Sequence, residues 1–177
     1  MFYRLLFCCT LLFSGSAFAH VQWEVEADPM AYALKGFSAH VARPFSAGRF
    51  RLQLGTYGAE LPQWTYGNSA FTVNSRGGTI KFDYFPLRPL DGLFFGVDSN
   101  YSQVRYELNQ THERRYNNIT GLGPRVGYRF NVGEHFYVSP WISLDYQFGA
   151  KDVSVAGETV RGNKLSVFPT VHLGWRF

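Results

Sequence analysis

The sequence predicts an all-β protein, an eight-stranded antiparallel up-and-down β-barrel that crosses a membrane. Segments of roughly ten residues alternate between apolar and polar side chains, which is the period of a β-strand. After the N-terminal nineteen residues no apolar run approaches the roughly 20 residues of a membrane helix. Glycines fall mainly on the polar face of the alternation, where a narrow barrel interior needs small side chains. Together these observations favour a closed barrel with its apolar face outward.

The N-terminus has the pattern of a secretory signal peptide. Arg4 precedes an apolar run at residues 5–13, and the small-residue ending Ala17-Phe18-Ala19 follows. We therefore expect residues 1–19 to be removed, which leaves 177 − 19 = 158 residues, 20–177, as one barrel domain. Cys8 and Cys9 both lie in the leader, so the exported chain has no disulfide, thiolate metal site or cysteine nucleophile.

The charge balance excludes several classes of function. The chain has 17 basic and 13 acidic residues, and loss of Arg4 with the leader leaves 16 − 13 = +3. Basic residues form no run beyond Arg114-Arg115, and neither a helix-turn-helix pattern nor a nucleotide-binding glycine loop is present. We expect no nucleic-acid partner. The spacing of the histidines and acidic residues predicts no metal site, and no cofactor is expected.

Eight alternating segments follow the leader. The first covers residues 21–27 and stops at Asp28-Pro29, after which residues 30–35 fit either a helical turn or the start of the next strand. The other predicted strands span residues 36–42, 49–57, 79–84, 93–102, 121–131, 136–148 and 165–177. Between them, short turns at 44–48, 88–92 and 133–135 alternate with long polar connections at 61–77, 107–118 and 149–164. An even strand number places both chain ends on one side of the membrane.

The last two strands have the clearest alternation. In residues 165–177 every odd position is apolar, and Phe168 is the one large apolar residue among the even positions. Prolines interrupt three predicted strands, and since proline lacks the backbone N–H we expect bulges or local gaps in the pairing there. These residues are Pro124, Pro140 and Pro169.

A soluble, lipocalin-like barrel is the alternative to a membrane barrel, because alternation alone does not say which face is inside. The apolar face carries bulky residues in nearly every strand, more than one small lumen holds, and aromatic residues gather near strand ends. The membrane barrel is therefore favoured. Its polar face then supplies five acids and five bases to the lumen, which we expect to form an ion network that plugs it. These residues are Glu24, Glu26, Asp83, Asp98 and Asp145 with Arg51, Lys81, Arg125, Arg129 and Arg176.

The C-terminus carries a family resemblance. An apolar alternation through Leu173 and Trp175 to a C-terminal Phe177 resembles the closing strand of bacterial outer-membrane barrels, in which such an ending is read by the barrel-assembly machinery. The whole mature chain is similar in architecture to the small OmpA/OmpX-type barrels. This resemblance implies a monomer in the outer membrane of a Gram-negative bacterium, in contact with outer-membrane lipid and lipopolysaccharide, with short periplasmic turns and longer outer loops.

We expect a structural or surface-interaction protein that acts through its extracellular loops. Loop residues that could contact lipopolysaccharide or an outside partner are Trp64, Tyr66, Phe71, His112, Arg114 and Arg115. For the aromatic residues, packing onto the barrel rim is at least as good an interpretation, and for the charged ones a solvated loop tip is the better interpretation.

An outer-membrane enzyme of the lipid A modifying type, or a narrow channel for small solutes, is the alternative function. His40 and His172, beside Ser38 or Ser166, are the catalytic candidates. Both histidines fall near the periplasmic ends of their strands, whereas the lipid A palmitoyltransferase, lipid A deacylase and omptin-type barrels act toward the outer face. Packing in the lumen is the better interpretation, so we predict no catalytic residue and no enzyme.

Overall fold

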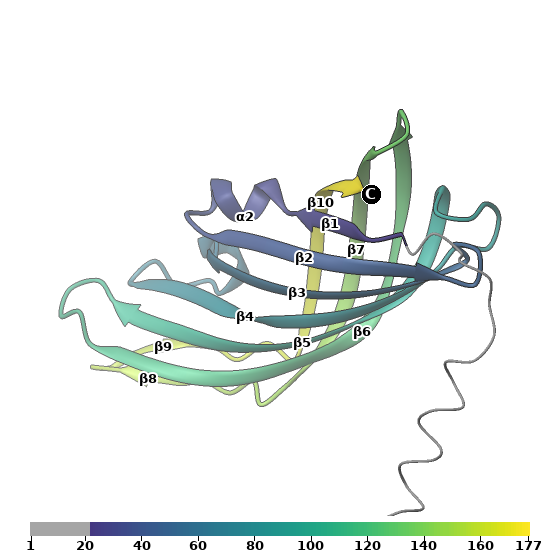
Figure 1. The fold of residues 1–177 in the computed structure, drawn as a ribbon. Coiled ribbons are helices and arrows are strands. Elements are labelled where there is room, and N and C mark those ends of the chain that lie inside the picture. Colours follow the sequence, from purple (N-terminus) through teal and green to yellow (C-terminus); the bar gives the residue numbers. More distant parts are fainter. Residues whose placement is uncertain (1–21) are drawn as a thin grey trace, which may run out of the picture.

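The computed structural model describes residues 22–177, and the predicted leader lies outside these residues. Eight antiparallel strands form a closed barrel (Figure 1). They are β1 (Glu24–Ala27), β2 (Phe37–Phe45), β3 (Phe50–Glu60), β4 (Phe71–Tyr84), β5 (Gly92–Leu108), β6 (Arg114–Val132), β7 (Phe136–Phe148) and β10 (Leu165–Arg176). Each strand pairs with the next barrel strand along the chain, and β1 also pairs with β10 to close the ring. The predicted fold class is confirmed.

Four short elements lie between the barrel strands. They are the helix α2 (Pro29–Ala33), the 3-10 turn η1 (Gln63–Thr65) and a hairpin of β8 (Val153–Val155) and β9 (Glu158–Val160). Helix α2 begins where it does because the Asp28 side chain accepts a hydrogen bond from the Met30 N–H at 2.8 Å and Pro29 follows Asp28. Within residues 22–177 no helix has the length and hydropathy needed to cross a bilayer.

The two ends of the barrel differ. At one end Trp23 and Phe177 exchange backbone hydrogen bonds of 3.2 and 3.1 Å, so the beginning and end of the described chain lie side by side. We call this the terminal end; it also holds the connections 46–49, 85–91 and 133–135. The opposite loop end holds the connections 61–70, 109–113 and 149–164.

Strand β1 is too short to cover its neighbour. On β10 it pairs with Leu173–Arg176, so in the described part of the chain residues 165–172 of β10 have no strand partner on that side. Helix α2 packs against β10, β2 and β3 at this place. The Thr170 hydroxyl donates to Asp28 Oδ2 at 2.7 Å, which ties the start of the helix to β10. The helical turn that was one of two predictions for residues 30–35 therefore fills a gap in the barrel wall.

The predicted limits hold for β7, and the largest errors lie at the loop end, although at the terminal end β1 begins later and β2 ends later than predicted. Strands β4, β5 and β6 run further than predicted, so the predicted connections 61–77 and 107–118 shorten to 61–70 and 109–113. In these extensions polar residues occupy the outward face while the backbone ladder continues, so the hydropathy alternation disappears before the pairing does. Pro44 and Phe45 belong to β2 and not to a turn, and the hairpin within 149–164 was not predicted.

The prolines interrupt the ladder in two of three cases. Between β6 and β7 the pairing breaks at Pro124, and again opposite Pro140. The register is the same on both sides of each break, so these are gaps and not bulges. Pro169 pairs regularly opposite Ile142 on β7, and its other side faces the gap that β1 leaves. The missing N–H is therefore tolerated where β10 has one neighbour.

Candidate functional site

Arg51 on β3 joins three carboxylates inside the barrel. Its side chain is buried, its Nε donates to Glu24 Oε2 at 2.7 Å, and its Nη1 donates to Asp83 Oδ2 at 3.1 Å. A third bond runs from Nη2 to Glu26. Arg51 and Asp83 are direct partners in the β3–β4 ladder, so the pairing register brings them together.

Glu24 on β1 is the second centre of this network. Arg129 donates hydrogen bonds to both of its oxygens, from Nη2 to Oε1 at 2.6 Å and from Nη1 to Oε2 at 3.2 Å. Arg176, its ladder partner on β10, donates through Nε at 3.2 Å, and the Tyr137 hydroxyl donates at 3.2 Å. The guanidinium of Arg129 also lies 3.4 Å from the centre of the Tyr137 ring. This fully buried carboxylate therefore has charge-assisted partners on both oxygens.

Glu26 links the ion network to two histidines. His172 Nδ1 lies 2.7 Å from Glu26 Oε2, and the rings of His172 and His40 face each other with centres 4.8 Å apart. His40 Nε2 lies 2.9 Å from Ser38 Oγ, while His40 Nδ1 has no hydrogen-bond partner among residues 22–177. The carboxylate thus holds one histidine and the serine contacts the other. A serine–histidine–carboxylate triad, in which one imidazole bridges both groups, is not formed.

A second layer of charges lies toward the middle of the lumen. Arg125 Nε lies 3.4 Å from Asp83 Oδ1, and its guanidinium stands 4.1 Å from the centre of the Trp141 ring. The Lys81 ammonium stands 4.7 Å from the same ring. Asp98 and Asp145 each accept a hydroxyl hydrogen bond, from Thr79 at 2.6 Å and from Ser143 at 2.9 Å. Trp141 therefore offers its ring to two neighbouring cations of this layer.

The structure places all ten predicted lumen charges on the inward face, and nine of them are buried while Arg176 is partly exposed. Sequence reasoning missed the aromatic residues that the cations contact. Tyr137 and Trp141 occupy polar positions in the alternation of β7, and Phe94 does so in β5. An aromatic residue at a polar position was the available signal, because it must face the lumen.

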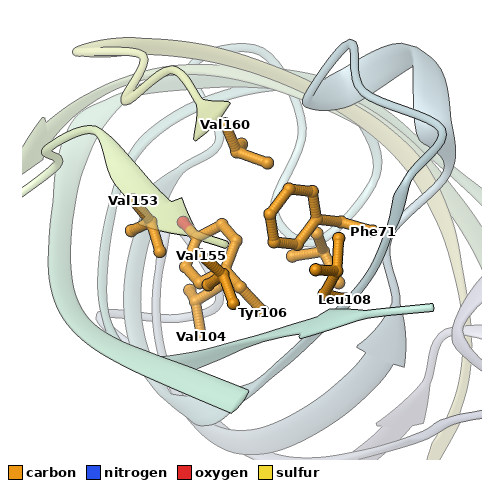
Figure 2. Packing of buried hydrophobic residues seen from close by; sticks show 8 residues of the cluster. Phe71, Val104, Tyr106, Leu108, Val153, Val155 and Val160 are labelled. Atoms are coloured by element: carbon orange, nitrogen blue, oxygen red, sulfur yellow. The ribbon is translucent and has the colours of Figure 1, made fainter. Parts of the chain in front are cut away.

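Buried apolar side chains form a cluster inside the barrel at its loop end, which we call the apolar cap. Its members from the inward faces of β4 and β5 are Phe71, Val73, Val104, Tyr106 and Leu108. The β8–β9 hairpin adds Val153, Val155 and Val160, and Figure 2 shows the two groups pointing toward one another. Leu61, Tyr66, Ala70 and Ile119 pack against this cluster. The sequence did not predict this cap, because it depends on a hairpin folding back over strands far away in the chain.

Phe71 corrects one prediction. It was proposed as a loop contact, but it begins β4 and is 2 % exposed within the apolar cap. Trp64 in η1 is 75 % exposed and remains free to contact a partner. The hydroxyl of Tyr66 donates to the Phe71 carbonyl at 2.9 Å, and burial, helped by the nearby Glu60, raises the pKa of Tyr66. Tyr66 therefore packs the loop onto the rim.

At the tip of the β5–β6 hairpin, two basic side chains contact the Glu107 carboxylate. Arg114 Nε lies 2.8 Å from Glu107 and His112 Nδ1 lies 3.2 Å from it, while Arg115 is exposed beside them. Hydrogen bonds from Arg114 and then His112 lower the pKa of Glu107. At the other end of the barrel, the predicted assembly residues lie exposed on the outward face of β10 and just after it; these are Leu173, Trp175 and Phe177. In the described part of the chain no group of three or more metal-ligating side chains comes together.

An eight-stranded ring with an apolar exterior and a charged interior defines the fold of an outer-membrane β-barrel. The chain is similar in structure to a major outer membrane protein from Thermus thermophilus, with a TM-score of 0.52 and 14% identity over 89% of this chain and 99% of that one. It also matches Neisserial surface protein A, with a TM-score of 0.42 and 12% identity over 88% and 94% of the two chains. No protein-family model and no curated protein matches the sequence.

Proposed function

We propose that the protein is an integral outer-membrane barrel with a closed lumen, which acts as a structural and surface-interaction protein and not as a channel or an enzyme. The observation that carries this proposal is that the ion network crosses the lumen. Glu24 on β1 binds Arg129 on β6, although β10 and β7 lie between these strands around the ring. Arg51 on β3 also reaches the Tyr137 hydroxyl on β7, at 3.4 Å.

The distribution of side chains supports the placement in a membrane. Large apolar residues are exposed on the outward faces of the barrel strands, as with Leu54, Ile80 and Ile142. A surface of this kind needs lipid contact, since a soluble protein rarely leaves so large an apolar area in water. The terminal end then faces the periplasm and the loop end faces the outside.

Two separate groups of side chains, the ion network and the apolar cap, support the proposal of a closed lumen. The ion network fills the half nearer the terminal end, where Glu24, Arg51 and Arg129 are buried. The apolar cap closes the loop end. Buried charges tolerate a low dielectric only when they are paired and hydrogen-bonded, so opening a water path would require separating both sets of contacts.

The alternatives have weaker support. A channel needs a continuous polar path, and the apolar cap lies across it. A serine hydrolase needs one imidazole that joins serine to carboxylate, whereas Ser38 and Glu26 bind different histidines. The surface exposed to a partner is then the loop end, where Trp64, Arg114 and Arg115 are accessible.

A liposome-swelling assay tests the closed lumen. Refolded protein, checked for a heat-shifted gel band, is incorporated into liposomes that are diluted into an isotonic solution of a small sugar. We expect no swelling above that of protein-free liposomes. Swelling at a rate proportional to the protein content would overturn the proposal.

A further inference from the structure

The outward face of β4, β5 and β6 changes character at one level. Tyr101 on β5 lies between Gly78 on β4 and Thr120 on β6 in the ladder, and outward residues nearer the terminal end are mainly apolar. The next outward row toward the loop end is Arg76, Gln103 and Asn118, which are direct ladder partners. This row therefore stands where the barrel leaves the apolar layer.

A hollow of about 390 Å³ lies on this boundary. Its walls include Phe37, Tyr57, Arg76, Tyr101, Gln103 and Asn118. Gly58 pairs with both Phe37 and Arg76 in the ladders, and a Cβ there would lie 2.7 Å from the Phe37 ring. The absence of a side chain at Gly58 thus gives the Phe37 ring its place at the edge of the hollow. The hollow combines aromatic rings with amide and guanidinium groups.

Arg76 is held in place without being neutralised. Its Nη2 donates to Gln103 Oε1 at 2.9 Å, and within residues 22–177 it forms no ion pair. The neighbouring bases do have acidic partners: Arg114 lies 2.8 Å and Arg105 lies 3.9 Å from Glu107. Lys35 lies 3.1 Å from Glu60, the acid at this rim of β3. The remaining donors of Arg76 are therefore available to an anion at the hollow.

We propose that this hollow binds the phosphorylated glucosamine headgroup of lipid A, the lipid anchor of lipopolysaccharide. A guanidinium recognises phosphate through paired N–H donors, and Gln103 and Asn118 offer amides to sugar hydroxyls. The acyl chains lie along the apolar face that begins at Tyr101. The row of Arg76, Gln103 and Asn118 lies at the edge of the apolar layer. This position favours a lipid headgroup over free phosphate, because only the lipid presents its phosphate there while its acyl chains contact the barrel. This inference rests on the proposed membrane placement.

Native mass spectrometry of the detergent-solubilised barrel tests the proposal, with bisphosphorylated lipid A as the probe. We expect one tightly bound lipid A per barrel, and about a tenfold or greater loss of affinity in Arg76→Ala, because a charge-assisted hydrogen bond to phosphate is lost. Arg76→Lys keeps the positive charge but lacks the paired guanidinium donors, so this variant is expected to lose part of the affinity for lipid A. Dephosphorylated lipid A should bind as weakly to the native barrel as intact lipid A binds to Arg76→Ala.

The control variant is Arg43→Ala. Arg43 is also an outward arginine, but it lies on β2 near the terminal end, with its guanidinium 5.7 Å from the Trp23 ring centre. The Arg43→Ala variant should bind lipid A as tightly as the native barrel does. Equal losses in Arg43→Ala and Arg76→Ala, or inorganic phosphate competing at equimolar concentration, would overturn the proposed site. The heat-shifted gel band verifies folding of each variant. Sugar-driven swelling would contradict the closed lumen and leave the lipid A site standing, so the two proposals fail separately.

Discussion

Arg51 Nε and Glu24 Oε2 lie 2.7 Å apart with their side chains 3 % and 0 % exposed, although β2 separates their two strands. Removing two charges from water costs several kcal/mol for each ion, so such a contact persists only where further hydrogen bonds satisfy both groups. Here Arg51 reaches three carboxylates, and Glu24 accepts from three arginines and a tyrosine. Arg51, Glu24 and their partners therefore form one connected network of buried charges.

Removing the centre of this network should destabilise the barrel strongly. Arg51→Ala leaves Glu24, Glu26 and Asp83 with fewer cations, and breaking a buried pair from one side costs about 3–5 kcal/mol. The free energy of unfolding in urea, measured in detergent, is the readout. Arg43→Ala, which removes an outward arginine, is the matched control and should change that free energy by less than about 0.5 kcal/mol. Equal stability of the two variants would rule out a buried network.

A methyl group at Gly55 should destabilise the barrel through His40. A Cβ at Gly55 would lie 1.7 Å from His40 Nδ1, so the buried ring would have to move. We expect Gly55→Ala to lower the free energy of unfolding by about 1–3 kcal/mol, as overpacking does in other protein interiors. Gly55→Ala should lower the free energy of unfolding by less when His40→Ala is also present. Additive effects in this double-mutant cycle would show that the two residues do not meet.

A charge within the apolar cap should release the β8–β9 hairpin. Val155 is 2 % exposed, and Val155→Asp would place an unpaired carboxylate among apolar side chains. We expect protease cleavage within residues 149–164 to become much faster, while the barrel keeps its heat-shifted band. Ser154→Asp is the control, since Ser154 precedes it on the exposed face of β8. A hairpin that is cleaved equally fast in both variants would mean that the cap does not hold it.

The tip of the β5–β6 hairpin should loosen in acid. The pKa of Glu107 is lowered below its ordinary value of 4.5, mainly by the hydrogen bond from Arg114. Its contribution to the stability of the tip is thus complete above that ordinary value and is lost as the pH falls through the lowered pKa. Hydrogen exchange of amides 108–114 should rise in this range relative to the rest of β5 and β6. Glu107→Gln should abolish the pH dependence, and a profile unchanged by this substitution would contradict the assignment.

The sequence predicted the barrel because the period of two survives wherever one face meets an apolar environment. For β7 and β10, with apolar residues at alternate positions, the predicted limits match the structure to within one residue. Near the loop end Asn74 and Arg76 face outward, so both faces of β4 carry polar residues or glycine over several positions. Hydropathy carries no strand signal there, although the backbone pairing continues.

The inward position of the charged residues could be predicted, but their partners could not. Alternation assigns Glu24 and Arg129 to the lumen, yet their contact joins residues 105 apart in the sequence and depends on the curvature of the closed ring. The separation of Ser38–His40 from His172–Glu26 is likewise decided by side-chain orientation. Burial of Phe71 was missed because it depends on the hairpin, which belongs to another loop.

Single-channel recording in a planar bilayer tests the closed lumen most directly. The refolded protein comprising residues 20–177, inserted and verified by its heat-shifted band, should give no steady conductance above the bare bilayer, because in the proposed function the Arg51–Glu24 network and the apolar cap both block the path. A steady, ion-selective conductance carried by the native barrel would contradict the closed lumen and would make transport the function to pursue.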